Sequence, residues 1–508
     1  MFTFISRRIL QGLATLLASS FLMYLLVSVS IRPLDDLLES TSPNKAQLIA
    51  ARIELLELDT PVVLRYVKWL GNFLTGDMGT AWVSGQAVND KLGGAVVSTL
   101  QLVGAATLLA ILFGVAVGIV SALRQYTSFD YLITFVSFVL YSLPAFWVAV
   151  LLKQWGAIGF NDFLADASQS WPAMIGAGVV MGLVATLAMG GDARRRATAF
   201  GIGLLATTGV LAYLSLSGWW STPHLGPVLI AVVGAGAAFG ITALSTGLKN
   251  RRALGSAVSV VVLGVVLYTP LQYLFAGISM SWPLAIVLGL VAAGSGWLVG
   301  RLWGGPDWGQ SARTAALTAV VVSAMVFVDR VMQVWPKYFA AGAIKGRPIA
   351  TVGDRTPNLG GDFWVRTLDM YTHLLLPTLA LLLISFAGYT RFSRASMLEV
   401  MGQDYIRTAR AKGLSERTVV MRHGFRNSMI PLATIVPLDV VALFGGAIIT
   451  EQVFGRPGMG QLFIKSLQHA EIEPIMAYLV ITAGLAVLAN ILADLIYAAL
   501  DPRIRVNA

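Results

Sequence analysis

Long apolar stretches alternate with shorter polar ones along most of the chain. Stretches long enough to cross a bilayer as a helix, about 20 residues each, occur at about 9–31, 95–122, 128–155, 172–190, 197–217, 226–247, 254–275, 283–300, 313–334, 371–391, 428–450 and 474–499. Their length and lack of strict alternation exclude a β-barrel. The pattern predicts an all-α, polytopic membrane protein with about twelve transmembrane helices.

The composition supports a membrane protein. The chain has 508 residues, of which 56% are hydrophobic and only 12% charged, whereas soluble domains carry about 25% charged residues. It has no cysteine, which excludes disulfides and thiolate sites. The apolar run after Arg7 and Arg8 is too long for a signal peptide, so we expect it to remain as the first span.

The distribution of basic residues predicts the orientation. If the N-terminus is cytoplasmic, alternate loops should carry the excess of Lys and Arg. The loops predicted to be cytoplasmic contain Arg124, Arg194, Arg195, Arg196, Lys249, Arg251, Arg252, Arg301, Arg313, the segment 404–432, Arg503 and Arg505. We therefore expect both termini to be cytoplasmic. Asp329 and Arg330 interrupt the span 313–334 and are expected near its outer end, because charges at mid-bilayer cost about 3 kcal/mol each.

Two regions stand out from this alternation. Residues 33–94 form a polar external region with helix signals of its own, which predicts a folded cap or a loop resting on the membrane. The block of about 171–334 is rich in Gly, Ala and Val and has short turns. Because its predicted helices are even in number, its presence leaves the sidedness of everything downstream unchanged.

The cytoplasmic segment "DYIRTARAKGLSERTVVMRHGFRNSMIPL" (404–432) is unusually cationic. Residues 403–412 favour a helix, Gly413 is a natural break, and Ser415 can cap a second short helix, 416–425. One interpretation is a cationic amphipathic helix on anionic lipid, worth about 1 kcal/mol per basic residue.

A family resemblance favours another interpretation. "TARAKGLSE…RHGFRNSMIP" resembles the cytoplasmic coupling loop of ABC importer permeases, in the form seen in dipeptide and oligopeptide permeases. In order along the chain, "FISRRILQGLATLLASSFLMYLLV", "LDTPVVLRYVKWLGNFLTGDMGTAWVSGQAV", "SLPAFWVAVLL", "LLLPTLALLL", "TRFSRASMLEVMGQDYIRTARAKGLSE", "TEQVFGRPGMGQLF" and "NILADLIYAALDPRIR" resemble the first permease subunit of such importers. Together they cover about 1–157 and 365–508.

The resemblance has two departures. The middle block is foreign to the six-helix family pattern, so no family role can be carried onto it. Arg407, Thr408 and Ala409 precede Gly413 where the wider importer motif has a glutamate and two alanines, which matches the peptide-type variant.

The resemblance implies a type I ABC importer core interrupted by extra helices. Residues 1–157 would hold three core helices and the external cap (about 33–94), and 158–335 an inserted block of about six helices. Residues 336–508 would hold three more core helices and the coupling loop (about 392–427). The implied function is a permease subunit of an ATP-driven dipeptide or oligopeptide importer in a bacterial cytoplasmic membrane. Nickel or another small solute is the alternative cargo within the same family.

The implied partners supply what the chain lacks. No G-x-x-x-x-G-K-[ST] loop occurs, so ATP and Mg are expected in two ATP-binding partner subunits and no cofactor in this chain. A second homologous permease, an extracytoplasmic substrate-binding protein and membrane lipid are the other expected partners, with no nucleic acid. We expect no catalytic residue and no metal site, because the four histidines lack ligand spacing.

Three groups of residues are candidates for function. For ATPase coupling they are Tyr405, Arg407, Thr408, Ala409, Arg410, Lys412, Gly413, Leu414, Ser415 and Arg417. For an external gate or docking turn they are Glu451, Phe454, Gly455, Pro457, Gly458 and Gly460, with an ordinary surface turn as the alternative. For the translocation pathway they are Pro144, Asp439, Gly445 and Gly446, with helix kinking, a structural hydrogen bond and close helix packing as the alternatives.

Two other classes of protein stay open. A twelve-helix secondary transporter fits the helix number, although such folds are usually built from matching halves. Here the external cap lies only in the first half and the long cationic loop only in the second. A membrane scaffold whose loop binds lipid is the other alternative.

Overall fold

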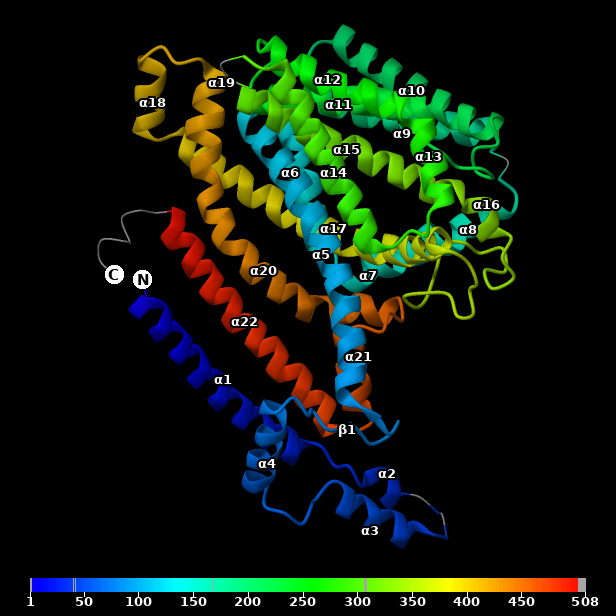
Figure 1. Ribbon diagram of the computed structural model, residues 1–508, viewed down its shortest axis with the longest axis vertical. Coiled ribbons are helices and arrows are strands. Elements are labelled where there is room, and N and C mark those ends of the chain that lie inside the picture. Colours follow the sequence, from blue (N-terminus) through cyan, green and yellow to red (C-terminus); the bar gives the residue numbers. More distant parts are fainter. Residues whose placement is uncertain (1, 40, 42, 168, 306–307, 501–508) are drawn as a thin grey trace. The chain divides into compact units, whose positions relative to one another are not determined.

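The computed structural model describes residues 2–39, 41, 43–167, 169–305 and 308–500. Helices make up almost all of its regular structure, which confirms the predicted all-α class (Figure 1). The exception is a two-residue antiparallel ladder, in which β1 (Thr80–Ala81) pairs with β2 (Gln86–Ala87). The chain forms two compact units, one of residues 1–154, 351–354 and 374–508 and one of residues 155–350 and 355–373.

The first unit holds the two ends of the chain. Its helices are α1 (Phe2–Ser30), α2 (Asp35–Leu38), α3 (Lys45–Leu55), α4 (Val62–Leu74), α5 (Val88–Leu123), α6 (Ser128–Ser142), α7 (Ala145–Leu151), most of α17 (Phe363–Met401), α18 (Asp404–Ala411), α19 (Glu416–Thr418), α20 (Arg426–Val453), α21 (Met459–Gln468) and α22 (Ile472–Leu500). A π-helical segment, Val419–Phe425, joins α19 to α20.

The second unit holds the inserted block. A π-helical segment, Leu152–Gly159, leads into α8 (Phe160–Ala165), followed by α9 (Trp171–Met189), α10 (Ala193–Leu216), α11 (Gly226–Ser245), α12 (Arg251–Val266), α13 (Tyr268–Gly277), α14 (Trp282–Trp303), α15 (Trp308–Gln333) and α16 (Trp335–Phe339). The first turns of α17 complete it.

The number of membrane-spanning helices agrees with the prediction. Within the described ranges, nine helices are long and apolar enough to span a membrane, and three bent pairs raise the number to twelve if each pair is one span. The pair α6–α7 bends by 100° at Pro144, which confirms the kink expected there. The pair α12–α13 bends by 51°, just before Pro270, whose ring and missing N–H disfavour a continuous helix.

Two expected helix boundaries are wrong. The span predicted at 371–391 is the central part of α17, which runs for 39 residues, because its polar ends remain helical beyond the apolar stretch. The separate second helix expected at 416–425 instead continues through the π-helical segment into α20. Nothing between Glu416 and Ile430 stops a helix except Gly424, which here permits close contact with Met397 and Met401.

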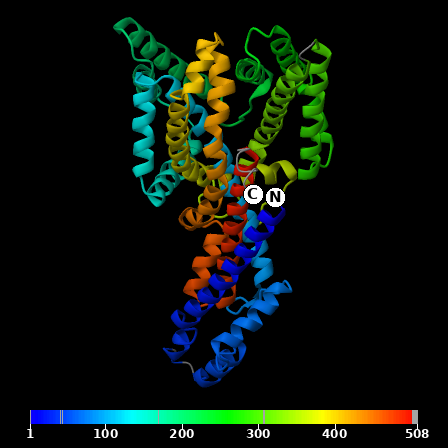
Figure 2. The same ribbon diagram turned by 90° about the vertical axis from the view of Figure 1, so that its left-hand side faces the viewer.

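In the first unit, contacts between distant segments define two opposite ends. At one end Arg8 of α1 pairs with Asp494 of α22 at 3.1 Å. Towards the other end Tyr66 and Trp69 of α4 pack in a cluster with Met476 of α22. Figures 1 and 2 show α1 lying along α22, with α2, α3 and α4 beyond the far end of α1. The region 33–94 therefore contains helices, of which α4 packs on the bundle.

Small residues let α5 approach α17. A Cβ at Gly114 would lie 2.8 Å from Cβ of Tyr389, and a Cβ at Gly118 would overlap Oγ of Ser393 and the carbonyl oxygen of Thr390. In membranes, helices associate largely by such close packing, since lipid is as apolar as the side chains. These glycines set the spacing of the two longest helices of the first unit.

The core of the second unit joins the inserted helices to the start of α17. Ile230 of α11, Ala257 of α12 and Val326 of α15 share one buried cluster with Trp364 and Leu368. The indole Nε1 of Trp364 also donates a hydrogen bond to the carbonyl oxygen of Phe275, at 3.2 Å. The second unit therefore extends beyond the block expected at 158–335 and includes residues of the predicted core.

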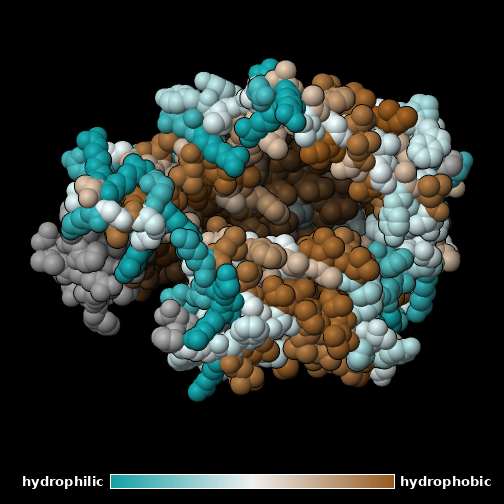
Figure 3. Space-filling model, turned by 90° about the horizontal axis from the view of Figure 1, so that it is seen from above, coloured by the Kyte–Doolittle hydropathy of each residue, from teal (hydrophilic) through white to brown (hydrophobic). Residues whose placement is uncertain are grey.

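Large hydrophobic side chains remain exposed on the helices of both units. Leu302 is 86% exposed and Leu205 72% exposed. Figure 3 shows broad areas of hydrophobic residues on the face seen from above the view of Figure 1. Surfaces of this kind are covered by a bilayer or a partner protein.

Candidate functional site

The cationic segment folds as a helix, a tight turn and a second helical stretch. α18 covers one face of the turn after it, because Ile406 and Ala409 pack on Val419 in a small buried cluster. Gly413 has a φ of +76°, the left-handed conformation that glycine adopts without strain. Ser415 caps the next helix by accepting a hydrogen bond from the N–H of Thr418.

Polar and charged side chains pair along the same segment. Nη2 and Nε of Arg410 donate to the two carboxylate oxygens of Glu416 at 2.7 and 3.1 Å, across the Gly413 turn. This hydrogen bonding raises the pKa of Arg410 above its usual value. Arg407 lies 3.3 Å from the carboxylate of Asp404 on the same helix. The Nδ2 of Asn427 donates to the hydroxyl of Tyr405 at 3.1 Å, which ties α18 to the start of α20.

The outer face of this segment combines charge with exposed apolar groups. Tyr405 is 42% exposed and Leu414 41% exposed. Other candidates on this face are also exposed: Arg407, Thr408, Arg410, Lys412, Gly413, Ser415 and Arg417. Ala409 alone among the coupling candidates is buried. A cationic surface with a few apolar anchors has the character of a protein-binding surface.

A buried ion pair supports the helices that lead to this segment. Arg394 of α17 donates from Nε and Nη2 to the two carboxylate oxygens of Asp130 at 2.7 and 2.8 Å. The hydroxyl of Ser121 and the N–H of Tyr126 donate to the same carboxylate. Asp130 is 2% exposed. The pair fixes α17 to the α5–α6 turn, and the sequence analysis did not find it because its members lie 264 residues apart.

A second polar cluster surrounds the turn between α20 and α21, where the external candidates lie. Glu451 is fully buried and accepts from the hydroxyl of Thr99 at 2.6 Å and the N–H of Gln461 at 3.0 Å. The hydroxyl of Thr99 accepts in turn from the N–H of Met459 at 2.8 Å. These bonds fasten the turn to α5.

The glycines of this turn permit its close packing. A Cβ at Gly458 would overlap the carboxylate of Glu451, and one at Gly460 would lie against the backbone of Ile448. Gly455 has a φ of +57°. Phe454, the residue before it, is 2% exposed. Of the external candidates, only Pro457 is classed as exposed. The turn is thus built into the bundle, and its gating or docking role stays a prediction.

Arg456 lies in the same turn, and the sequence analysis missed it. It is 1% exposed. Its Nη2 donates to Oε1 of Gln101 at 3.2 Å and weakly to the carbonyl oxygen of Ser98 at 3.5 Å. Burial lowers its pKa, and the carboxylates of Asp354 and Glu451 oppose this effect. The sequence feature that could have identified Arg456 is its position between Gly455 and Pro457 in an otherwise apolar motif.

The candidates for the translocation pathway do not gather at one place. Pro144 precedes α7 at the 100° break. Asp439 is half-buried in α20, beside the hydroxyl of Tyr389. A Cβ at Gly445 would meet nothing within 4 Å, so close packing within the described chain does not explain this glycine. Gly446 lies in α20, and its surroundings are outside what the structure describes.

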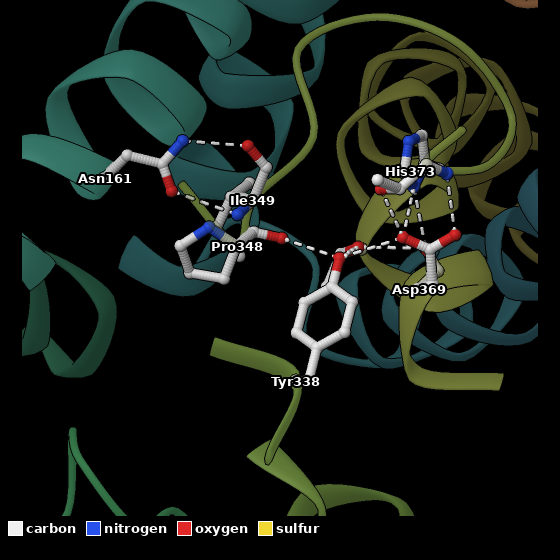
Figure 4. Close-up of polar contacts among 8 residues, drawn as sticks. Asn161, Tyr338, Pro348, Ile349, Asp369 and His373 are labelled. Carbon is white, nitrogen blue, oxygen red and sulfur yellow. Dashed lines mark hydrogen bonds and ion pairs between the residues drawn. The ribbon is translucent and has the colours of Figure 1, made fainter. Parts of the chain in front are cut away.

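The second unit has polar networks of its own (Figure 4). The hydroxyl of Tyr338 donates to Oδ1 of Asp369 at 3.0 Å, and Asp369 also accepts from the N–H of Thr356 at 2.8 Å. The side chain of Asn161 bonds both the N–H and the carbonyl oxygen of Ile349, at 3.0 and 2.8 Å. His373 lies against Asp369. These bonds hold the loop around 341–362 on α8 and α17.

Asp329 is part of a separate network inside the inserted block. One carboxylate oxygen accepts from the N–H groups of Leu225 and Gly226 at the start of α11, at 2.6 and 3.2 Å. The other accepts from the hydroxyl of Tyr268 at 2.6 Å and from Nε2 of Gln333 at 2.9 Å. The carboxylate thus satisfies the free N–H groups of a helix terminus. Its role is structural.

Neither polar cluster of the first unit has the chemistry of a catalytic or metal centre. Across the described ranges, no group of three or more His, Cys, Asp or Glu side chains could hold a metal ion. The arrangement offers instead an exposed cationic surface at one end of the bundle and a buried polar turn that is fastened to α5. These are features suited to contact with other proteins and to movement of helices.

Comparison with known proteins identifies the kind of chain that carries these features. Residues 351–506 match the family described as "Binding-protein-dependent transport system inner membrane component". The chain is 24% identical over 504 residues to the oligopeptide transport system permease protein OppB of Mycobacterium tuberculosis, with 99% of both chains covered.

Shorter, closer matches fall on part of the chain. It is 46% identical over 136 residues to the oligopeptide transport system permease protein AppB of Bacillus subtilis, covering 27% of this chain and 43% of AppB. It is 43% identical over 138 residues to the dipeptide transport system permease protein DppB of Escherichia coli, covering 27% and 41%. The matched residues make up a larger share of AppB and DppB than of this chain, so this chain is longer than either relative. Residues 351–506 thus match the inner membrane components of binding-protein-dependent transport systems, and the relatives that this chain resembles over its whole length or part of it are permease proteins.

Proposed function

We propose that this chain is the first permease subunit of an ATP-driven importer of dipeptides or oligopeptides. The names of its relatives, OppB, AppB and DppB, support peptides as the cargo. With a second homologous permease it would form the translocation pathway. Two cytoplasmic ATP-binding subunits and an extracytoplasmic substrate-binding protein would complete the system, with both ends of this chain cytoplasmic. Arg503 and Arg505, which contributed to that orientation, lie outside the described residues.

The exposed face of residues 404–417 carries the proposal. In it α18 is held in place by the packing of Ile406, while Tyr405 and Leu414 remain exposed. A preformed surface loses little conformational entropy when it binds. We assign this surface to a groove of an ATP-binding subunit, with Arg407 and Lys412 meeting acidic or carbonyl groups.

Movement of this surface would be passed to the bundle. The segment continues without a break into α20, and Asp130 and Arg394 fasten α17 to α5 and α6. Helices packed in this way shift as rigid bodies. Closure of the ATP-binding subunits would draw the segment along and open the pathway outward, and hydrolysis would reset it.

Substitution of Gly413 by valine tests the coupling role. Gly218 is a matched control, because it has a φ of +66° against +76° for Gly413, and a Cβ at either position meets nothing within 4 Å. Both Gly413→Val and Gly218→Val strain the backbone similarly. In proteoliposomes with the complete complex, we expect Gly413→Val to abolish ATP-driven peptide uptake and Gly218→Val to retain it.

Two outcomes would contradict the proposal. Equal uptake by both variants would show that the Gly413 turn does not couple ATP to transport, as expected if the segment only rests on lipid. Uptake by the wild-type chain without ATP-binding subunits would instead support a secondary transporter.

A further inference from the structure

Arg456 has unused capacity to donate hydrogen bonds. Among the described residues its Nε and Nη1 find no hydrogen-bond partner, although the side chain is 1% exposed. A buried charged group that lacks part of its hydrogen bonding destabilises the state that encloses it. Such a group in a membrane protein calls for a functional explanation.

The nearby acidic groups do not use this capacity. Glu451 accepts from the hydroxyl of Thr99 at one carboxylate oxygen and from the N–H of Gln461 at the other, and Nε and Nη1 of Arg456 donate to neither. Asp354 contributes a favourable electrostatic interaction with Arg456. The guanidinium is therefore balanced in charge but incompletely hydrogen-bonded.

Asp354 belongs to a short loop, residues 351–354, that packs on the same turn. The N–H of Gly353 donates to the carbonyl oxygen of Phe454 at 2.8 Å, and the side chain of Val352 lies against Gly455. Through these contacts the loop forms a cover over the turn. Its removal would take away the countercharge and expose the guanidinium.

A second donor lies beside the arginine. Ser98 is 4% exposed, and its Oγ also has no partner among the residues described. Its carbonyl oxygen already accepts from Nη2 of Arg456. The free N–H bonds of this guanidinium, one on Nε and two on Nη1, lie next to a free hydroxyl and suit a carboxylate, which accepts several hydrogen bonds at once.

Resting on the proposed import of peptides, we propose that Arg456 binds the C-terminal carboxylate of the peptide cargo, in place of Asp354, when the turn between α20 and α21 opens. The carboxylate of the cargo accepts hydrogen bonds from the guanidinium, so the open state gains stability only when a peptide with a free carboxylate is present. Arg456 is thereby a specificity-determining residue of the pathway. The chemistry required of the ligand is a carboxylate, whether from the cargo or from a docking protein.

Uptake of a peptide acid and of its C-terminal amide separates these sources. In proteoliposomes with the complete importer, we compare wild type with Arg456→Gln, supplying a labelled tripeptide in both forms with the same substrate-binding protein. We expect Arg456→Gln to reduce uptake of the acid about tenfold more than uptake of the amide, which corresponds to loss of a charge-assisted hydrogen bond. The quantity compared is the ratio of acid uptake to amide uptake, in the variant and in the wild type. A preference set by the substrate-binding protein affects both ratios equally and therefore cancels.

Two controls keep the test decisive. Arg456→Lys retains the charge and should keep part of the preference for the acid even if the glutamine variant assembles poorly. Arg347→Gln, at an arginine that is 61% exposed, should leave both uptakes unchanged. Equal reduction of acid and amide uptake by both Arg456 variants would overturn the inference, since that result indicates a structural role or a carboxylate of the docking protein. Absence of ATP-driven uptake of either form by the wild type would instead refute the proposed function.

Discussion

At the scale of single residues, the ion pair of Arg394 with Asp130 makes the strongest polar contact between α17 and the α5–α6 turn. Removing one member of a buried pair leaves an uncompensated charge, which typically costs about 3–5 kcal/mol. We expect Arg394→Gln to lower the free energy of unfolding by an amount in this range, measured by denaturant titration in detergent micelles.

The pair Lys337–Asp362 is the matched control. Its side chains are 63% and 52% exposed, and exposed pairs contribute about 0–1 kcal/mol. Lys337→Gln should therefore change the free energy of unfolding little. If both substitutions lowered the free energy of unfolding by the same amount, the Arg394–Asp130 pair would contribute no more to stability than an exposed pair.

The glycines of α5 provide a second residue-scale prediction. A side chain at Gly118 would overlap Ser393 and Thr390, whereas one at Gly104, on the same helix, would meet nothing within 4 Å. Overpacking of a tight contact costs about 1–3 kcal/mol. We expect Gly118→Val to lower the midpoint of thermal aggregation in detergent and Gly104→Val to leave it unchanged. The reverse order would contradict the α5–α17 packing.

Some of these residues could be predicted from sequence and others could not. Gly413, Ser415 and Pro144 act on their own neighbours in the chain, so local rules for turns, caps and kinks located them. Asp130 and Arg394 act through partners far away in the sequence, as does Arg456 with Gln101, 355 residues apart. Such pairs are invisible until the helices are packed.

At the scale of elements, α18 combines an inner face that holds it in place with an outer face that is exposed. Ile406 is fully buried, while Leu414 just after α18 is 41% exposed. Substitution of each residue in turn therefore separates folding of the segment from the proposed binding. Helix positions were predictable from apolar length, but the π-helical continuation into α20 and the polar ends of α17 were not, because neither changes the hydropathy pattern.

Truncation of the buried residue should loosen the segment. Ile406→Ala removes packing on Val419 and should cost about 2–5 kcal/mol of local stability. We expect faster hydrogen–deuterium exchange across 404–425 in this variant. Leu414→Ala should leave this exchange unchanged in the isolated permease and weaken coupling of ATP hydrolysis to uptake. Loss of protection in both variants would show that Leu414 is a folding residue.

At the scale of the whole molecule, an importer permease is interrupted by a helical block that shares a core with the start of α17. Trp364 and Leu368 pack with residues of α11, α12 and α15. The number of spans was predictable from hydropathy. The packing of the block on the start of α17 could not be predicted, because the contacts join residues far apart in sequence.

Deletion of residues 171–334 with a short linker tests what the block contributes. The number of spans removed is even, so we expect the downstream segments to keep their sidedness in a cysteine-accessibility assay. The deletion removes the residues that bury Trp364 and Leu368. We therefore expect the truncated chain to have a lower thermal stability than the full chain. A truncated chain as stable as the full one would show that the block is an accessory without a structural role.

The most direct test of the central claim is cross-linking from Leu414 to an ATP-binding subunit. The native chain has no cysteine, so Leu414→Cys provides a single attachment point for a thiol–amine cross-linker in native membranes. The control is Leu302→Cys, at a leucine of the second unit that is 86% exposed. The account predicts an adduct with an ATP-binding subunit from position 414 and none from 302. A co-purified ATP-binding subunit that cross-links to neither position, or equally to both, would contradict it.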